Sequence, residues 1–424
     1  MGLTERAWRT LAEHLDLARR LREDGSCEVT ADEIKCVTGR EPRLMAKFDT
    51  RASRPTALSR ATLLPIANGK YVVLDGDGYH DVEATAEVIP WQISSQVARL
   101  ATLPWNGVPA SESQAIDMAL ISGALGDFLG DDNLFLTVRG RRRTPAFDMQ
   151  FQGRSGAHTL RVNGVQVECD AGLEGQHLHL IEAKLGHRDD FLVRQIYYPY
   201  RMWGALLPEK ERSAVFLTWS NRTFAFRRYR FDPEGSYHGL RLVKAADYVL
   251  DQRGERPSLR EAVDTATLEA LPRGVPFPQA DDMRRVVDVV EAVAAGCTSK
   301  QALSDRWGFA GRQGDYYANA AAFMGLLARR GSVFRLSENG KLFARWQTTE
   351  RQRYFVGRMA VLPVFCEVIR RAVEHGRLPD RQAVADLVAE ATSLTGTTPP
   401  RRAITVLSWV RWAVEACSDE IELA

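Results

Sequence analysis

Two short apolar runs between residues 165 and 186 carry charged side chains where a buried strand would have only apolar ones. Asp170 ends the run VQVECD, and Glu182 and Lys184 interrupt the run LHLIEAK. Both runs have the period-two pattern of strands. An ionised side chain in the interior of a sheet is costly unless it has a partner. The fold must therefore bring a ligand or opposite charges to this place.

Side chains two positions apart lie on the same face of a strand, so Glu182 and Lys184 share a face. If the two strands pair through the turn AGLEGQ, Asp170 comes alongside both. Two carboxylates and the carbonyl oxygen of Ala183 would form an all-oxygen site that suits Mg²⁺, with Mn²⁺ as a substitute. A histidine-based metal site at HLH is less favoured, because His179 points to the opposite face from Glu182.

Such a site fits phosphodiester hydrolysis. A divalent ion polarises the phosphoryl oxygen and lowers the pKa of a bound water. Lys184 can orient that water or stabilise the charge that develops on the phosphate. The alternative is a surface hairpin with an ordinary ion pair, which would contain the same residues.

Asp170, followed on the next strand by Glu182-Ala183-Lys184, resembles the signature of the PD-(D/E)xK nucleases, which include type II restriction endonucleases. The predicted order of a helix at 111–130, three strands (FDMQFQG, VQVECD and LHLIEAK), a helix at 190–207 and another strand resembles the core of that family. The resemblance implies that Asp170, Glu182 and the Ala183 carbonyl hold Mg²⁺. It also implies that Lys184 assists the attacking water.

Two helical residues resemble further parts of such sites. Gln195 lies where many members have a glutamine near the metal, although Pro199 is predicted to kink or end its helix. Glu112 resembles the extra helical acid of some members; the alternative is a first-turn acid stabilised by the helix dipole. Glu168 is either a third ligand or an exposed strand acid.

The predicted fold class is α/β (α+β), with a PD-(D/E)xK restriction endonuclease-like core followed by an all-helical winged helix-turn-helix domain. Residues 1–90 form an N-terminal α+β region, 91–250 the nuclease core, 251–280 a linker, 281–348 the winged helix and 349–424 C-terminal helices. The hairpin SVFRLSENGKLFARW is the expected wing, with Asn339 and Gly340 in a type I′ turn.

Several basic and polar residues are predicted to contact DNA. Arg141, Arg142 and Arg143 precede the first predicted core strand, and arginine forks suit phosphate oxygens; a solvated turn is the alternative. Further candidates are Arg194, the helix-turn-helix residues Arg312, Gln313 and Tyr316, and the N-terminal residues Arg40, Arg43 and Lys47. The helix-turn-helix residues lie at the end of the second helix that enters the major groove in such modules. Winged helices also serve as protein interfaces.

Composition adds few limits. A net charge of +2 neither requires nor excludes nucleic acid. Six scattered cysteines indicate reduced thiols, and no apolar run is long enough to span a bilayer. We expect a cytoplasmic, homodimeric, Mg²⁺-dependent and sequence-specific endonuclease of double-stranded DNA: a type II restriction enzyme in defence against foreign DNA. The alternatives are a non-catalytic winged-helix DNA-binding protein and a modification-dependent or repair nuclease.

Overall fold

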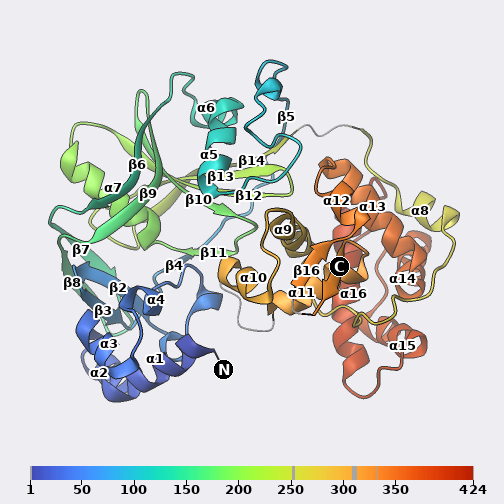
Figure 1. The fold of residues 1–424 in the computed structure, drawn as a ribbon, viewed down its shortest axis with the longest axis horizontal. Coiled ribbons are helices and arrows are strands. Elements are labelled where there is room, and N and C mark those ends of the chain that lie inside the picture. The colour runs from blue at the N-terminus through green and yellow to red at the C-terminus, as the bar shows by residue number, and fades with distance from the viewer. Residues whose placement is uncertain (1, 251–253, 308–312, 332, 424) are drawn as a thin grey trace.

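A seven-stranded mixed sheet forms the centre of the protein, whose computed structural model describes residues 2–250, 254–307, 313–331 and 333–423 (Figure 1). Its strands are β5 (Val88–Trp91), β6 (Phe135–Arg143), β9 (Gln166–Glu174), β10 (Leu178–Leu185), β12 (Arg212–Ser220), β13 (Thr223–Phe231) and β14 (Leu240–Leu250). They are ordered β5-β14-β13-β12-β10-β9-β6. The β10–β12 and β14–β5 pairs are parallel, and the other pairs are antiparallel.

Helices cover both faces of β10, and all of its residues are buried (Figure 1). Even-numbered side chains such as Leu180 belong to an apolar cluster that includes α7 (Arg194–Leu206). Odd-numbered side chains such as Ile181 belong to a second cluster with α5 (Glu112–Ile121) and α6 (Ala124–Leu129). Each buried aliphatic side chain contributes about 1.5–3 kcal/mol. The predicted mixed α/β class is thus confirmed. The prediction that side chains alternate between two faces of the strand that carries Glu182 and Lys184 is also confirmed.

The N-terminal region is a small α+β unit that packs against the central sheet. Its helices are α1 (Leu3–His14), α2 (Leu17–Glu23), α3 (Ala31–Thr38) and α4 (Pro42–Met45), and its sheet has the order β1-β3-β2 (Ser26–Thr30, Lys70–Leu74, Thr62–Ala67). Thr30 and Glu33 form a capping box that starts α3. Single 3₁₀ turns lie at Arg51–Ser53, Thr56–Leu58 and Val97–Arg99. The strand β4 (Tyr79–Asp81) pairs with β11 (Asp190–Leu192), which leads into α7.

The C-terminal part is mainly helical and encloses its own apolar core. Its helices are α8 (Leu259–Thr265), α9 (Met283–Ala294), α10 (Lys300–Trp307), α11 (Gln313–Phe323), α12 (Glu338–Phe343), α13 (Thr348–Val361), α14 (Pro363–His375), α15 (Arg381–Ala391) and α16 (Thr398–Ala416). The short strands β15 (Leu327–Arg330) and β16 (Val333–Leu336) form a hairpin after α11. The expected linker at 251–280 contains α8, whose Leu259 and Val263 belong to this core.

One strand assignment and one turn in the core were predicted wrongly. FDMQFQG is β7 (Phe147–Gln152), which pairs with β8 (Ala157–Val162) outside the main sheet, because its buried side chains pack with the N-terminal sheet. Its place beside β9 is taken by β6, so Arg141, Arg142 and Arg143 lie within a strand. The turn is not AGLEGQ either: β9 continues through buried Leu173 to Glu174, and the chain turns at residues 175–177.

The predicted wing was also wrong. Asn339 and Gly340 lie in α12, where Ser337 is the N-cap and its hydroxyl accepts a hydrogen bond from Gly340 N at 3.0 Å. The hairpin is formed by the preceding residues. Pro199 does not end its helix, because α7 continues through it to Leu206 with Tyr197 and Tyr200 buried.

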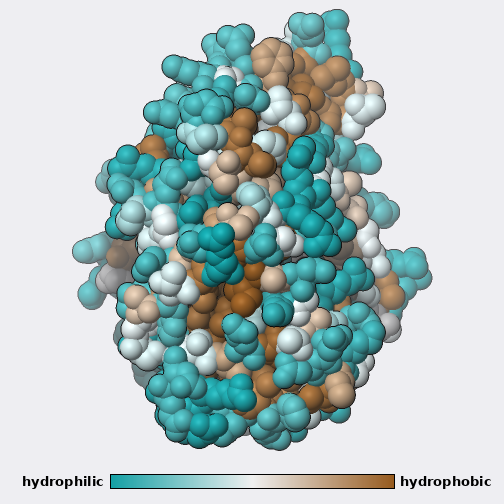
Figure 2. All heavy atoms as spheres, turned by 90° about the vertical axis from the view of Figure 1, so that its left-hand side faces the viewer, coloured by the Kyte–Doolittle hydropathy of each residue, from teal (hydrophilic) through white to brown (hydrophobic). Residues whose placement is uncertain are grey.

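The face that bears α7 and the N-terminal region is mostly hydrophilic, with apolar residues in a strip near its middle and at its upper end (Figure 2). Such a mixture is ordinary for a protein surface. Among the helices that the structure describes, none combines the length and the apolar character needed to cross a bilayer.

Candidate active site

The pairing of β9 with β10 brings the predicted site residues together. Leu180 lies opposite Gly172 and Ile181 opposite Ala171, so one further step along the register sets Asp170 opposite Glu182. The Oδ2 atom of Asp170 accepts a hydrogen bond from Ala183 N at 2.9 Å. The two carboxylates therefore meet on one face, at the end of the sheet where α5 and α7 flank β10.

Lys184 is buried among acceptors on this face. Its Nζ lies 2.5 Å from Glu182 Oε1, 3.1 Å from the Ala183 carbonyl oxygen and 3.7 Å from Glu112 Oε1. Glu112 is the first residue of α5, whose N-cap Ser111 accepts from Gln114 N. An acid that only balanced the helix dipole would not need Lys184 as a neighbour. The position of Glu112 therefore favours its predicted place in the site over the helix-dipole alternative.

Gln195 on α7 completes the contacts to Glu182. Its Nε2 donates to Glu182 Oε1 at 2.8 Å. Its Oε1 is buried and has no hydrogen-bond partner in the described parts of the chain. A buried acceptor without a donor is unusual in a folded protein. A water molecule or another donor in the site would satisfy it.

The electrostatics of the site show an excess of negative charge. Burial raises the pKa of Glu182 to about 8, and Asp170 and Glu112 add to this against the opposing effect of Lys184. Burial also raises the pKa of Glu112. Burial alone would lower the pKa of Lys184, but Glu182, Glu112, Asp49 and Asp170 together raise it. Several carboxylates thus surround one ammonium group.

This donor set fits a hard divalent cation. Asp170, Glu182 and Glu112 offer carboxylate oxygens, and Ala183 offers its carbonyl oxygen, which are the ligand types that Mg²⁺ prefers. A bound cation would offset the negative charge that raises the pKa of Glu182, and a bound water could donate to Gln195 Oε1, which has no donor among the residues that the structure describes.

Two charged residues near the site were missed in the sequence. Asp49 belongs to the N-terminal region; its carbonyl accepts from Leu192 N at 3.0 Å, and its charge acts on Lys184 and Glu112. Arg188 is buried, donates to the His187 carbonyl at 3.0 Å, and lies within electrostatic reach of Glu112 and Asp49. The position of Arg188, three residues after the end of β10, could have indicated from the sequence that it lies near the site. No local feature of the sequence pointed to Asp49.

A second group that could hold a metal lies beyond the end of β10. The ligand atoms of His187, Asp189 and Asp282 all lie within 4.8 Å of one another. However, Arg285 forms an ion pair with Asp189, and Arg284 contacts Asp282 at 2.9 Å. These arginines already neutralise the carboxylates, so the group serves as an ion-pair cluster between the sheet and α9. The HLH histidine His179 is not part of it; its Nδ1 lies 2.8 Å from Ser213 Oγ.

The predicted DNA-contacting arginines of β6 lie one strand beyond Asp170. Arg141 is paired with Glu168 in register and contacts its carboxylate at 3.1 Å, so Glu168 is engaged away from the candidate metal ligands. Arg142 lies over the ring of Trp203 at 5.2 Å, and Arg143 donates to the Gly164 carbonyl at 3.0 Å. All three are exposed on an edge strand.

The other predicted contacts are more scattered. Arg194 starts α7, next to Gln195, and its backbone N–H donates to Tyr237 Oη. Gln313 and the half-buried Tyr316 lie in the first turn of α11, whereas Arg312 lies outside the described residues. Arg43 and Lys47 are exposed in the N-terminal region, and Arg40 is partly buried there.

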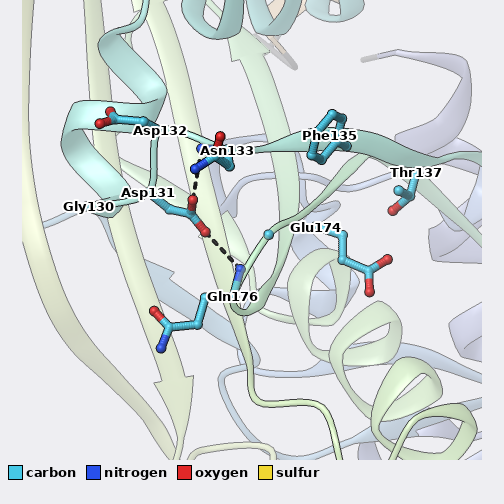
Figure 3. Close-up of a pocket in the computed structure, with 9 residues that line it drawn as sticks. Gly130, Asp131, Asp132, Asn133, Phe135, Thr137, Glu174 and Gln176 are labelled. Carbon is cyan, nitrogen blue, oxygen red and sulfur yellow. Dashed lines mark hydrogen bonds between the residues drawn. The ribbon is translucent and has the colours of Figure 1, made fainter.

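A surface hollow of about 800 Å³ lies at the opposite end of β9 and β10 (Figure 3). Asp131, Asp132 and Glu174 are among its lining residues, and Asp131 accepts from Asn133 N and Gln176 N. Along a strand, the distance from Leu178 to Lys184 is about 20 Å. This acidic hollow is separate from the candidate site and does not suit a phosphate.

Three family models match the chain, and each is described as a domain of unknown function. They cover residues 5–73 (DUF6996), 74–249 (DUF6997) and 285–418 (DUF7226). Neither the curated proteins nor the solved structures contain a match. These descriptions name no activity, so functional inference starts from the geometry of the site.

Proposed function

We propose that this protein is a Mg²⁺-dependent, sequence-specific endonuclease of double-stranded DNA, with a PD-(D/E)xK-type core and a winged-helix domain. The observation that carries the proposal is the convergence of Asp170, Glu182 and Lys184 on one face of adjacent strands, with Gln195 on Glu182. A scaffold would have no reason to bury this excess of charge.

The order of elements supports the nuclease core. The helix α5 precedes β6, β9 and β10, and α7 then leads to β12, which is parallel to β10. The winged-helix assignment has comparable support. After α9, the residue Ser299 forms a bridge with Val333 of β16, and α10, α11 and the β15–β16 hairpin follow. Lys300 and Asp315 form an ion pair that joins α10 to α11.

Each site residue has a definable part in hydrolysis. A bound Mg²⁺ would supply Lewis-acid activation of the phosphodiester and of the attacking water. Asp170 is held in place by Ala183 N, and Glu182 by Gln195. Lys184 can hold the attacking water and balance the charge that grows on the phosphate. Gln195 Oε1, which lacks a donor in the described part of the chain, can accept a hydrogen bond from that water.

The test is incubation of the full chain with unmodified and methylated phage and plasmid DNA, in Mg²⁺ or in EDTA. Asp170→Asn and Lys184→Ala should abolish cleavage. Glu174→Gln is the matched control, because Glu174 lies on the same strand β9 at its far end, beside Lys210. Cleavage of methylated DNA alone would favour the modification-dependent enzyme. Intact DNA with every substrate, together with metal-independent binding, would favour the non-catalytic DNA-binding protein.

A further inference from the structure

The helix α9 of the C-terminal part presents two buried acids to the central sheet. Asp288 and Glu291 are 3% and 4% exposed and lie one turn apart on the same face of α9. Buried carboxylates require partners. Both acids find partners at the end of the central sheet, so the two parts of the chain are joined there by hydrogen bonds to these buried acids.

Asp288 holds the chain directly after the ExK strand. Its Oδ2 accepts from His187 N at 2.7 Å, and its Oδ1 accepts from Ser220 Oγ at 2.6 Å. Gly186 N donates to the Trp219 carbonyl at 2.7 Å, and Gly186 has φ +88°, where the chain leaves β10. Asp288 thus bridges the ends of β10 and β12. Its contact beyond β10 is at His187, three residues after Lys184.

The next residue extends this contact to the site. Arg188 is buried, and its guanidinium interacts electrostatically with Asp288 and also with Glu112 and Asp49. A shift of the His187–Arg188 backbone would therefore move a positive charge relative to the site carboxylates. It would also release the end of the strand that carries Glu182 and Lys184.

Glu291 also accepts hydrogen bonds at the end of the central sheet, but its partners are not connected to the candidate site. Its Oε1 accepts from Arg351 Nη1 at 2.6 Å, and its Oε2 from Asn221 N at 3.3 Å. Asn221 and Arg222 have φ of +50° and +60° in the turn between β12 and β13. Glu291 and Arg351 therefore stabilise this strained turn and not the end of β10.

We propose that Asp288 is a positioning residue of the candidate nuclease site, through which the C-terminal part fixes the end of β10 and the place of Lys184 and Arg188. The inference rests on the proposed function for its catalytic consequence. It makes the C-terminal part a component of the site and not only a domain tethered to it. Catalytic groups must be held closely, since a displacement of about 1 Å can cost about a hundredfold in rate.

The first readout is amide hydrogen exchange, which does not depend on activity. We expect Asp288→Ala to accelerate exchange in the peptide 183–190 about tenfold or more, because the acceptor for His187 N is lost. Asp288→Asn keeps the shape and one acceptor and should have a smaller effect. Glu291→Gln is the matched control from the same helix, and should loosen residues 220–222 only.

The second readout is the split between kcat and KM for DNA cleavage, with DNA affinity measured in Ca²⁺. Asp288→Ala should lower kcat about tenfold or more while KM and affinity stay within about threefold. Glu291→Gln should keep kcat within about threefold. Unchanged exchange at 183–190 in folded Asp288→Ala, or an equal loss of kcat in Glu291→Gln, would overturn the proposal. A wild-type protein that cuts no DNA would contradict the proposed function, and the exchange result would still decide whether Asp288 holds the strand end.

Discussion

Replacement of Glu182 by Gln should remove most of the pH dependence of stability that arises from the site. In the folded protein, burial and the neighbouring carboxylates raise the pKa of Glu182 from 4.5 to about 8. A raised pKa means that the folded state binds more protons than the unfolded state. The contribution to the free energy of unfolding is then full below pH 4.5 and is lost as the pH rises through 8.

From pH 5.5 to 7.5, this shift lowers the free energy of unfolding by about 2 to 3 kcal/mol. We therefore expect the wild type to lose about 2 to 3 kcal/mol more than Glu182→Gln over that interval, in urea denaturation with EDTA. Glu112 and Asp170 remain in the variant to balance Lys184.

Saturating Mg²⁺ should reduce the loss in the wild type, because a cation favours the ionised carboxylate. It should have little effect on Glu182→Gln. Glu174→Gln, an exchange of a partly exposed acid at the far end of β9, should behave like the wild type. Equal losses in the wild type and Glu182→Gln would refute the reasoning, and so would equal stabilisation of both by Mg²⁺.

Four further predictions concern DNA binding, catalysis, folding and assembly. Joint replacement of Arg141, Arg142 and Arg143 by Ala should weaken DNA binding and flatten the slope of log affinity against log salt by about 2 to 3. Anisotropy titrations at several salt concentrations measure this slope. An unchanged slope would mean that DNA does not reach β6. Gln195→Ala should lower the cleavage rate about tenfold or more with little change in DNA affinity, whereas a loss confined to affinity would contradict its role beside Glu182. Ser337→Ala should cost about 1 kcal/mol by removing the N-cap of α12, and Ser337→Asp should not; chemical denaturation compares them. Sedimentation should detect a homodimer on a palindromic DNA site, and one protein chain per duplex would contradict the expected two-fold arrangement.

The local pattern of the sequence was sufficient to predict the centre of the site. Alternation in LHLIEAK indicated a strand with Glu182 and Lys184 on one face, and pairing with the preceding strand set Asp170 beside them. The hydrophobic pattern was less informative about which strands pair with one another. FDMQFQG alternates as a core strand would, but β7 uses its apolar face against the N-terminal sheet. Period two identifies a strand without saying which sheet it joins.

The rest depended on contacts between residues far apart in the chain. Asp49 approaches Lys184 because the N-terminal region packs against β11, and no spacing rule relates these positions. Asp288 lies on a helix whose amphipathic pattern would have predicted a solvated acid there. Asn339-Gly340 was wrongly predicted to be a hairpin turn because the sequence SENG is compatible both with such a turn and with a helix that starts after a serine N-cap. In the structure, Ser337 is the N-cap of α12.

The most direct test of the central claim is to map the ends of the products after incubation of unmodified phage DNA with the protein and Mg²⁺. The account predicts discrete double-strand ends at one recurring sequence, absent in EDTA and absent with Asp170→Asn or Lys184→Ala. Intact DNA, or cleavage that persists in both variants, would contradict the assignment of Asp170, Glu182 and Lys184 as the active site.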